Sequence, residues 1–213
     1  KVTVKVKEGI AKGFFDDGER MERLDVIFAN RYLEAFEQCQ NNVVPTSAWQ
    51  VAFDASNRWW PIVLQHLLLG MNAHINLDLG IAAARTCPGN AVHHLKNDFN
   101  KINEILAGLV DEVERELTQV WPVLGLLDRI AGKTDEAVIN FSMTKARDHA
   151  WNVAEDLACL EELEQMPKID ELDREMAALG RKVRYPGLVI GTVTKTIRLG
   201  ERGTIPQIID ILK

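Results

Sequence analysis

Histidine and aspartate stand four residues apart at two places in this chain of 213 residues. His74 precedes Asp78, and His94 precedes Asp98. Residues four apart on a helix project from one face, so the members of each pair can act together. An imidazole titrates near neutral pH, and a neighbouring carboxylate fixes its tautomer, as a general acid–base group requires. The spacing predicts His74 and Asp78 as catalytic residues; the alternative is a buried hydrogen-bonded pair that sets helix packing.

The same side chains are also metal ligands. Helical bundles bind metal ions through carboxylates and imidazoles that project inward from facing helices. The connection between the two helices that carry the pairs is short, which predicts antiparallel neighbours. His74, Asp78 and Asp98 are therefore the predicted ligands of a divalent metal such as zinc, which would make the reaction a metal-assisted hydrolysis. For His94 and Asp98 the alternative is an ordinary surface interaction.

Arginine and amide side chains could complete this site. Arg147 is the third predicted catalytic residue, since its guanidinium would hold an anionic or carbonyl group of a substrate. Trp151 follows one helical turn later, so the guanidinium could lie against the indole. A buried arginine needs an anionic partner, and Asp78 and Asp98 are available. The predicted substrate-binding residues are His66, Asn72, Asn103, Trp151 and Arg31.

One helix must position most of these residues. The stretch from Trp60 to Arg85 is apolar on nearly every face, yet it contains His66, Asn72, His74 and Asp78. Several such polar groups would be costly within a bilayer. The pattern therefore predicts a long central helix buried in protein, and no membrane span.

The remaining periodicity predicts an all-α, compact multi-helix bundle. Residues 17–165 form the predicted helical core, with Asp16 or Asp17 as the cap of its first helix and Pro167 as the end of its last. Residues 1–16 are uncertain, because Val2, Val4 and Val6 alternate with polar residues as in a short edge strand. Residues 166–213 are predicted to form a peripheral helix and a helical or extended C-terminal arm.

Composition narrows the class of protein. Hydrophobic residues make up 46% and charged residues 26% of the chain, as in ordinary soluble globular proteins. The net charge of −6 argues against a nucleic-acid partner, which selects for clustered basic residues. Three cysteines at unrelated spacings indicate reduced thiols and a cytoplasmic location.

The central segment resembles an uncharacterised, mainly bacterial family, the domain of unknown function 5995. The resemblance rests on MNAHI at residues 71–75 followed by Asp78-Leu79, on Asp98-Phe99 with Ile102-Asn103, on Arg147 with Ala150-Trp151, and on Asn30-Arg31-Tyr32. It implies a helical single domain with these polar residues as the family's signature, but no established activity. A looser similarity to the helical zinc phospholipase C and single-strand nuclease superfamily touches His74 and Asp78 alone.

Two classes of function follow from these residues. The first is an enzyme with a buried His, Asp, Asn and Arg site that acts on an unknown small molecule. The second is a non-catalytic protein, in which the polar residues form a structural network. Such a protein would either enclose a small ligand or assemble into a homo-oligomer through residues 186–213.

Overall fold

The computed structural model describes residues 1–120, 143–201, 207, 208 and 210, and every regular element in that part of the chain is a helix. The predicted all-α fold is therefore confirmed. In chain order the elements are α1 (Val2–Ala11), α2 (Gly18–Gln40), α3 (Ser47–Ser56), α4 (Val63–Met71), the π-helix η1 (Asn72–Leu79), α5 (Gly80–Thr86), the 3-10 helix η2 (Gly89–Ala91), α6 (Val92–Val120), α9 (Met143–Ala158), α10 (Glu162–Arg184) and α11 (Gly187–Gly200).

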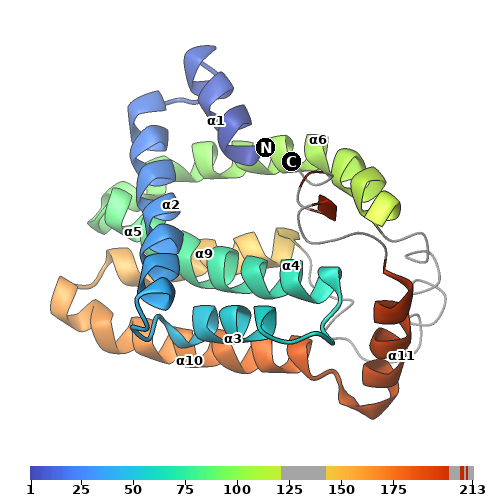
Figure 1. Ribbon diagram of the computed structural model, residues 1–213. Coiled ribbons are helices and arrows are strands. Elements are labelled where there is room, and N and C mark those ends of the chain that lie inside the picture. Colours follow the sequence, from blue (N-terminus) through green and yellow to red (C-terminus); the bar gives the residue numbers. More distant parts are fainter. Residues whose placement is uncertain (121–142, 202–206, 209, 211–213) are drawn as a thin grey trace.

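The helices α4, η1 and α5 join end to end into one central helix, Val63–Thr86. Of its most apolar window, 72% is buried inside the protein, which confirms the predicted long buried helix. It packs against α2, α3, α9 and α10, and Figure 1 shows α2 crossing it while α3 and α10 run alongside. This enclosure explains why the segment is apolar on nearly every face. By length and composition the same helix could also cross a membrane, so the expected absence of a span stays a prediction.

A π-helix occupies the middle of the central helix. Its eight residues, Asn72–Leu79, read NAHINLDL and carry both His74 and Asp78. Hydrogen bonds in a π-helix run from residue i to i+5, and such segments are rare, short and frequent at functional sites. The predicted site residues of this helix therefore lie on a wider turn than α-helical spacing assumes.

The N-terminal residues, which the sequence left uncertain between an edge strand and other structure, form the helix α1. Val2 and Val6 are four residues apart, so the alternation of valines also fits one face of a helix. Val6 is buried against the core, whereas Val4 is exposed, and a strand would place both on the same face. In α2 the expected cap is Asp17, whose carboxylate accepts a hydrogen bond from the backbone N–H of Arg20 at 2.9 Å.

Pro167 does not end a helix but lies inside α10, contrary to expectation. The helix α9 ends earlier, at Ala158, and α10 begins at Glu162. The Glu164 carboxylate accepts a hydrogen bond from the backbone N–H of Glu161 at 3.1 Å and so caps α10. The buried face of α10, which includes Leu172 and Met176, belongs to the main core and is not peripheral. The expected helix from residue 135 begins outside the described residues, which resume within α9.

The C-terminal arm is helical in its described part. Ile197 of α11 packs against Ile62, and the carboxylate of Glu201 accepts a hydrogen bond at 2.7 Å from the N–H of Val63, the first residue of the central helix. A carboxylate at a helix N-terminus is favourable. Leu188 and Leu199 are largely exposed on this arm. Self-association through residues 186–213 stays a prediction.

Gly80 marks the closest packing of the central helix. A Cβ atom there would lie 2.7 Å from the carbonyl oxygen of Ala150 and 2.7 Å from Val153 in α9, whereas one at Gly70 would meet nothing within 4 Å. We expect Gly80→Ala to lower the free energy of unfolding by about 2 kcal/mol or more. Gly70→Ala should raise it by up to about 1 kcal/mol, because alanine favours helix. Urea unfolding followed by circular dichroism measures both; equal effects would contradict this packing.

Candidate functional site

Asp78 is completely buried in the central helix and both of its carboxylate oxygens have donors. Oδ1 accepts a hydrogen bond from Nε of Arg31 at 2.7 Å, and Oδ2 accepts one from Nε1 of Trp49 at 2.8 Å. These donors come from α2 and α3, so one carboxylate ties two helices to the central helix. Asp78 is one of the two carboxylates that the sequence offers to a buried arginine, and the structure pairs it with Arg31. This pairing leaves Asp78 little capacity to bind a substrate.

His74 lies beside this carboxylate within an aromatic cluster. Its ring stacks on Phe28 with centroids 3.7 Å apart, and Tyr32 and Trp49 flank it at 6.1 and 6.0 Å. Nδ1 is 3.6 Å from Oδ2 of Asp78, which is longer than a hydrogen bond. This nitrogen is buried and has no hydrogen-bond partner among the described residues. The Phe28 stack fixes the plane of the ring, and the side chain remains 29% exposed.

The predicted residue Asn72, and with it the amides Asn76 and Gln65, belong to a separate group of contacts between the central helix and α10. Nδ2 of Asn72 donates to the carbonyl of Met176 in α10 at 2.8 Å, and Asn76 donates to Oδ1 of Asn72 at 3.0 Å. Gln65 donates in the same way to the carbonyl of Val183 at 2.8 Å. These amides fasten α10 to the central helix. Asn72 is therefore separated from the His74 cluster and binds backbone.

His66 also lies apart from His74. Burial lowers its pKa, and the nearby positive charges of Arg198 and Arg184 lower it further. Both arginines belong to the C-terminal half of the fold, in α11 and at the end of α10. The structure therefore places His66 at the junction with the C-terminal arm, away from the predicted site.

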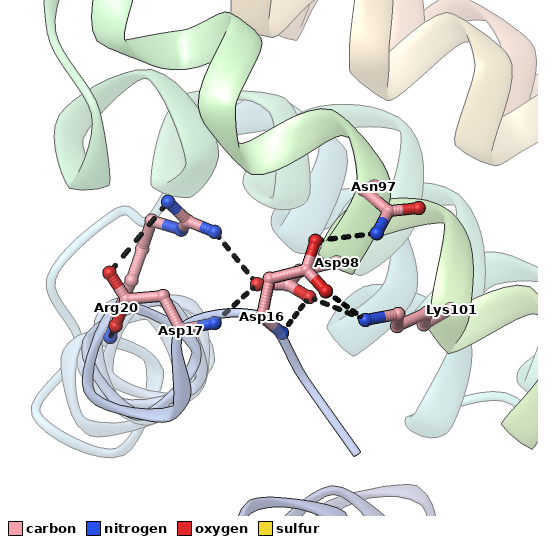
Figure 2. A network of polar contacts seen from close by, with 6 residues as sticks. All are labelled: Asp16, Asp17, Arg20, Asn97, Asp98 and Lys101. Carbon is pink, nitrogen blue, oxygen red and sulfur yellow. Dashed lines mark hydrogen bonds and ion pairs between the residues drawn. The ribbon is translucent and has the colours of Figure 1, made fainter. Parts of the chain in front are cut away.

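Asp98 is the centre of a separate polar network (Figure 2). It is fully buried and accepts hydrogen bonds from the backbone N–H groups of Asp16 and Asp17 at 2.7 and 3.0 Å, and from Nη2 of Arg20 at 2.7 Å. Burial alone would raise the pKa of Asp98, but these donors outweigh it and hold the pKa below its ordinary value. The network joins the start of α2 to α6.

The three predicted metal ligands do not come together. Asp98 is engaged with α2 and Lys101, and Asp78 with Arg31 and Trp49. Within the described residues there is no group of three or more His, Cys, Asp or Glu side chains that could hold a metal ion. The two His and Asp pairs at four-residue spacing thus contain two independent buried carboxylates, each paired with an arginine.

Arg147 of α9 is 4% exposed and binds α6. Nε donates to Oδ1 of Asn103, Nη2 donates to the carbonyl oxygen of Phe99, and the guanidinium lies 4.3 Å from the Phe99 ring centroid. Burial lowers the pKa of Arg147 to about 10, although the charge of Asp148 acts the other way. The structure confirms that Arg147 and Asn103 meet. It corrects the expected anionic partner, because the acceptors are an amide and a carbonyl.

The expected stacking of Arg147 on Trp151 is also wrong. Trp151 packs edge-on against Phe99, with ring centroids 5.1 Å apart, and its own face carries Nζ of Lys96 at 4.1 Å. Phe99 therefore separates the arginine from the indole. Residues one turn apart on a helix share a face only approximately, and a large side chain from the neighbouring helix fits between them.

A cavity of about 510 Å³ brings His74 and Arg147 to one space. Residues of α1, α2, η1, α6 and α9 form its walls. Its apolar lining includes Met21, Phe28, Ile75, Phe99, Ile102 and Leu106. Asp25 also lines it; burial raises the pKa of this carboxyl, against the opposing effect of His74. Sequence analysis missed Asp25, although it shares the inward face of α2 with Met21 and Phe28 at helical spacing.

Comparison with known proteins places the chain in one family. Residues 1–186 match the model of the Family of unknown function (DUF5995), so the chain belongs to that family, as the central segment indicated. The match extends beyond the α2 to α9 region on which the resemblance rested and includes α1 and α10. No curated protein and no solved structure matches the chain.

The contacts of Asp78 and His74 predict unequal losses of stability on substitution. Asp78→Asn preserves the volume but leaves the charge of Arg31 without a partner, so we expect a loss of about 3 kcal/mol in the free energy of unfolding. His74→Gln removes a stack on Phe28 and should cost about 1 kcal/mol. Urea unfolding curves of both variants measure the difference. A larger loss in the His74 variant would show that the histidine, not Asp78, holds the helices together.

Proposed function

We propose that this protein binds a small, largely apolar molecule in the cavity between α1, α2, η1, α6 and α9. The observation that carries the proposal is the cavity itself, about 510 Å³ within the size range of ligand sites. Protein interiors are otherwise close-packed, with few voids larger than a water molecule. A largely apolar cavity of this size can therefore hold a small molecule.

The distribution of polar groups around the cavity supports a specific ligand. Most of the wall is apolar, and His74, Asp25 and Arg147 are among its few ionisable groups. Binding sites for small molecules combine such apolar walls with a few polar groups that fix orientation. The π-helix η1 contributes one ionisable and one apolar residue to the cavity wall, the adjacent His74 and Ile75.

Filling the cavity from within should block binding. Ile75 lines the cavity, whereas Ile169 is a partly buried isoleucine packed on the core outside it. We expect Ile75→Trp to weaken binding of the neutral fluorophore N-phenylnaphthylamine by about tenfold, or about 1.4 kcal/mol. Ile169→Trp should leave the affinity unchanged.

Fluorescence titration of the two tryptophan variants and the unchanged protein gives the dissociation constants, and circular dichroism verifies that both variants are folded. The proposal fails if the unchanged protein does not bind the fluorophore. It also fails if Ile169→Trp weakens binding as much as Ile75→Trp does, since the probe would then occupy another place.

An enzyme is the second candidate, and the position of His74 favours it. Nδ1 is buried and faces Asp78 at 3.6 Å. A carboxylate on that side favours a proton on Nδ1, which would leave Nε2 with a lone pair. His74 would then be a general base toward a ligand held by the apolar walls. Because the described residues form no cluster of metal ligands, the candidate mechanism uses His74 alone as the acid–base group.

Turnover can be detected without knowing the substrate. A metabolite and lipid extract is incubated with the protein or with His74→Gln, and both mixtures are compared by mass spectrometry. We expect compounds consumed by the unchanged protein to persist with His74→Gln, because glutamine cannot exchange a proton near neutral pH. The variant should still bind N-phenylnaphthylamine. Identical profiles in the two mixtures would leave ligand binding as the sole function proposed for the cavity.

A further inference from the structure

Arg147 carries a positive charge to the wall of the cavity without an ion-pair partner among the described residues. Arg31, the other predicted arginine, and Arg20 differ in this respect, whereas the buried Arg184 also has no ion pair within the described part of the chain but does not line the cavity. Arg31 pairs with Asp78 and Arg20 pairs with Asp98, each at 2.7 Å. The acceptors of Arg147 are the neutral oxygens of Asn103 and Phe99. A buried charge is costly unless it is paired, so this side chain is set apart by its environment.

The guanidinium retains donors for a further acceptor. An arginine has five N–H donors in a fixed planar fork. Its two hydrogen bonds, to Asn103 and to Phe99, engage Nε and Nη2, and no hydrogen bond to Nη1 is formed within the described residues. Nη1 and the second proton of Nη2 lie side by side in the fork, the pair of donors that a carboxylate accepts bidentately. Asn103 and Phe99 therefore hold the guanidinium in place and leave its outer edge unoccupied.

The surroundings of Arg147 define the rest of the ligand. Phe99, Ile102 and Leu106 follow one another along the cavity-facing side of α6, next to the guanidinium. Such a row of side chains favours an apolar chain or ring. Phosphate groups are recognised by clusters of arginines, whereas Arg147 is the single arginine that lines the cavity among the described residues. Lys1 also lines it but has interactions of its own, so the unpaired charge of Arg147 matches that of one carboxylate.

We propose that the ligand of the cavity is an apolar carboxylic acid, bound in its ionised form with the carboxylate on Arg147 and the apolar part along α6. This inference rests on the proposed ligand-binding function and names the chemical class that the site selects. His74 and Asp25 also line this cavity.

The test compares acids with the alcohols of the same chain length. Octanoate, decanoate and dodecanoate, and the matching alkan-1-ols, displace N-phenylnaphthylamine from the protein at neutral pH. We expect the best acid to bind about tenfold tighter than its alcohol, because a charge-assisted hydrogen bond replaces a neutral one. In Arg147→Met the acid and the alcohol should bind equally, with the affinity for the alcohol retained.

Two further variants make the result independent of a folding defect in Arg147→Met. Asn103→Asp keeps the arginine but supplies a carboxylate at its side, so the preference for the acid should fall to within about twofold. Arg184→Met removes another buried arginine, which does not line the cavity, and should leave the preference unchanged.

The outcomes separate the two proposals. Binding of neither acids nor alcohols, nor of the fluorophore, would overturn the proposed ligand-binding function and this inference with it. Equal binding of acids and alcohols by the unchanged protein would overturn the carboxylate assignment alone, as would an acid preference that persists in both Arg147→Met and Asn103→Asp.

Discussion

The carboxylate of Asp78 is buried in the most apolar helix of the protein, and this one group constrains its surroundings. A buried charge is tolerated only when its oxygens have donors. Arg31 of α2 and Trp49 of α3 supply them, so those two helices must contact the central helix at this level. His74, four residues before Asp78, is thereby brought against the aromatic residues of the same two helices. That histidine lines the cavity.

The polar residues of the central helix face different directions and bind different helices. Asn72 and Gln65 bind backbone carbonyls of α10, while Asp78 binds α2 and α3. Asp98 performs the same task for α6 and the start of α2. After these anchors are satisfied, Arg147 retains unused N–H donors, and both His74 and Arg147 line the cavity. Under the proposed function, stability and ligand recognition would rest on different residues, and the variants proposed above can separate them.

Periodicity was sufficient to predict the all-α class and the long buried central helix. It left the cap of α2 open between Asp16 and Asp17, and the partner of a buried arginine open between Asp78 and Asp98. It failed where a choice depended on distant residues. The valines of α1 fit a strand or a helix until packing on α2 and α6 decides between them. Pro167 is accommodated on an exposed part of α10, because the glutamates at residues 161 and 164 cap the helix earlier. The predicted metal ligands share helical spacing but serve separate networks.

The sequence alone was enough to establish which residues are polar within apolar helices, because hydrophobic periodicity and helix caps are local properties. The side that each polar residue faces depended on the tertiary structure. A helix can rotate about its axis, and a π-helical turn shifts every residue after it, so spacing cannot tell whether a side chain meets a donor, a backbone carbonyl or a cavity. For this reason His74, Asp78 and Asp98 appear in the sequence as equivalent candidates for one site. Packing distinguishes the two structural carboxylates from His74 and Arg147, which line a cavity.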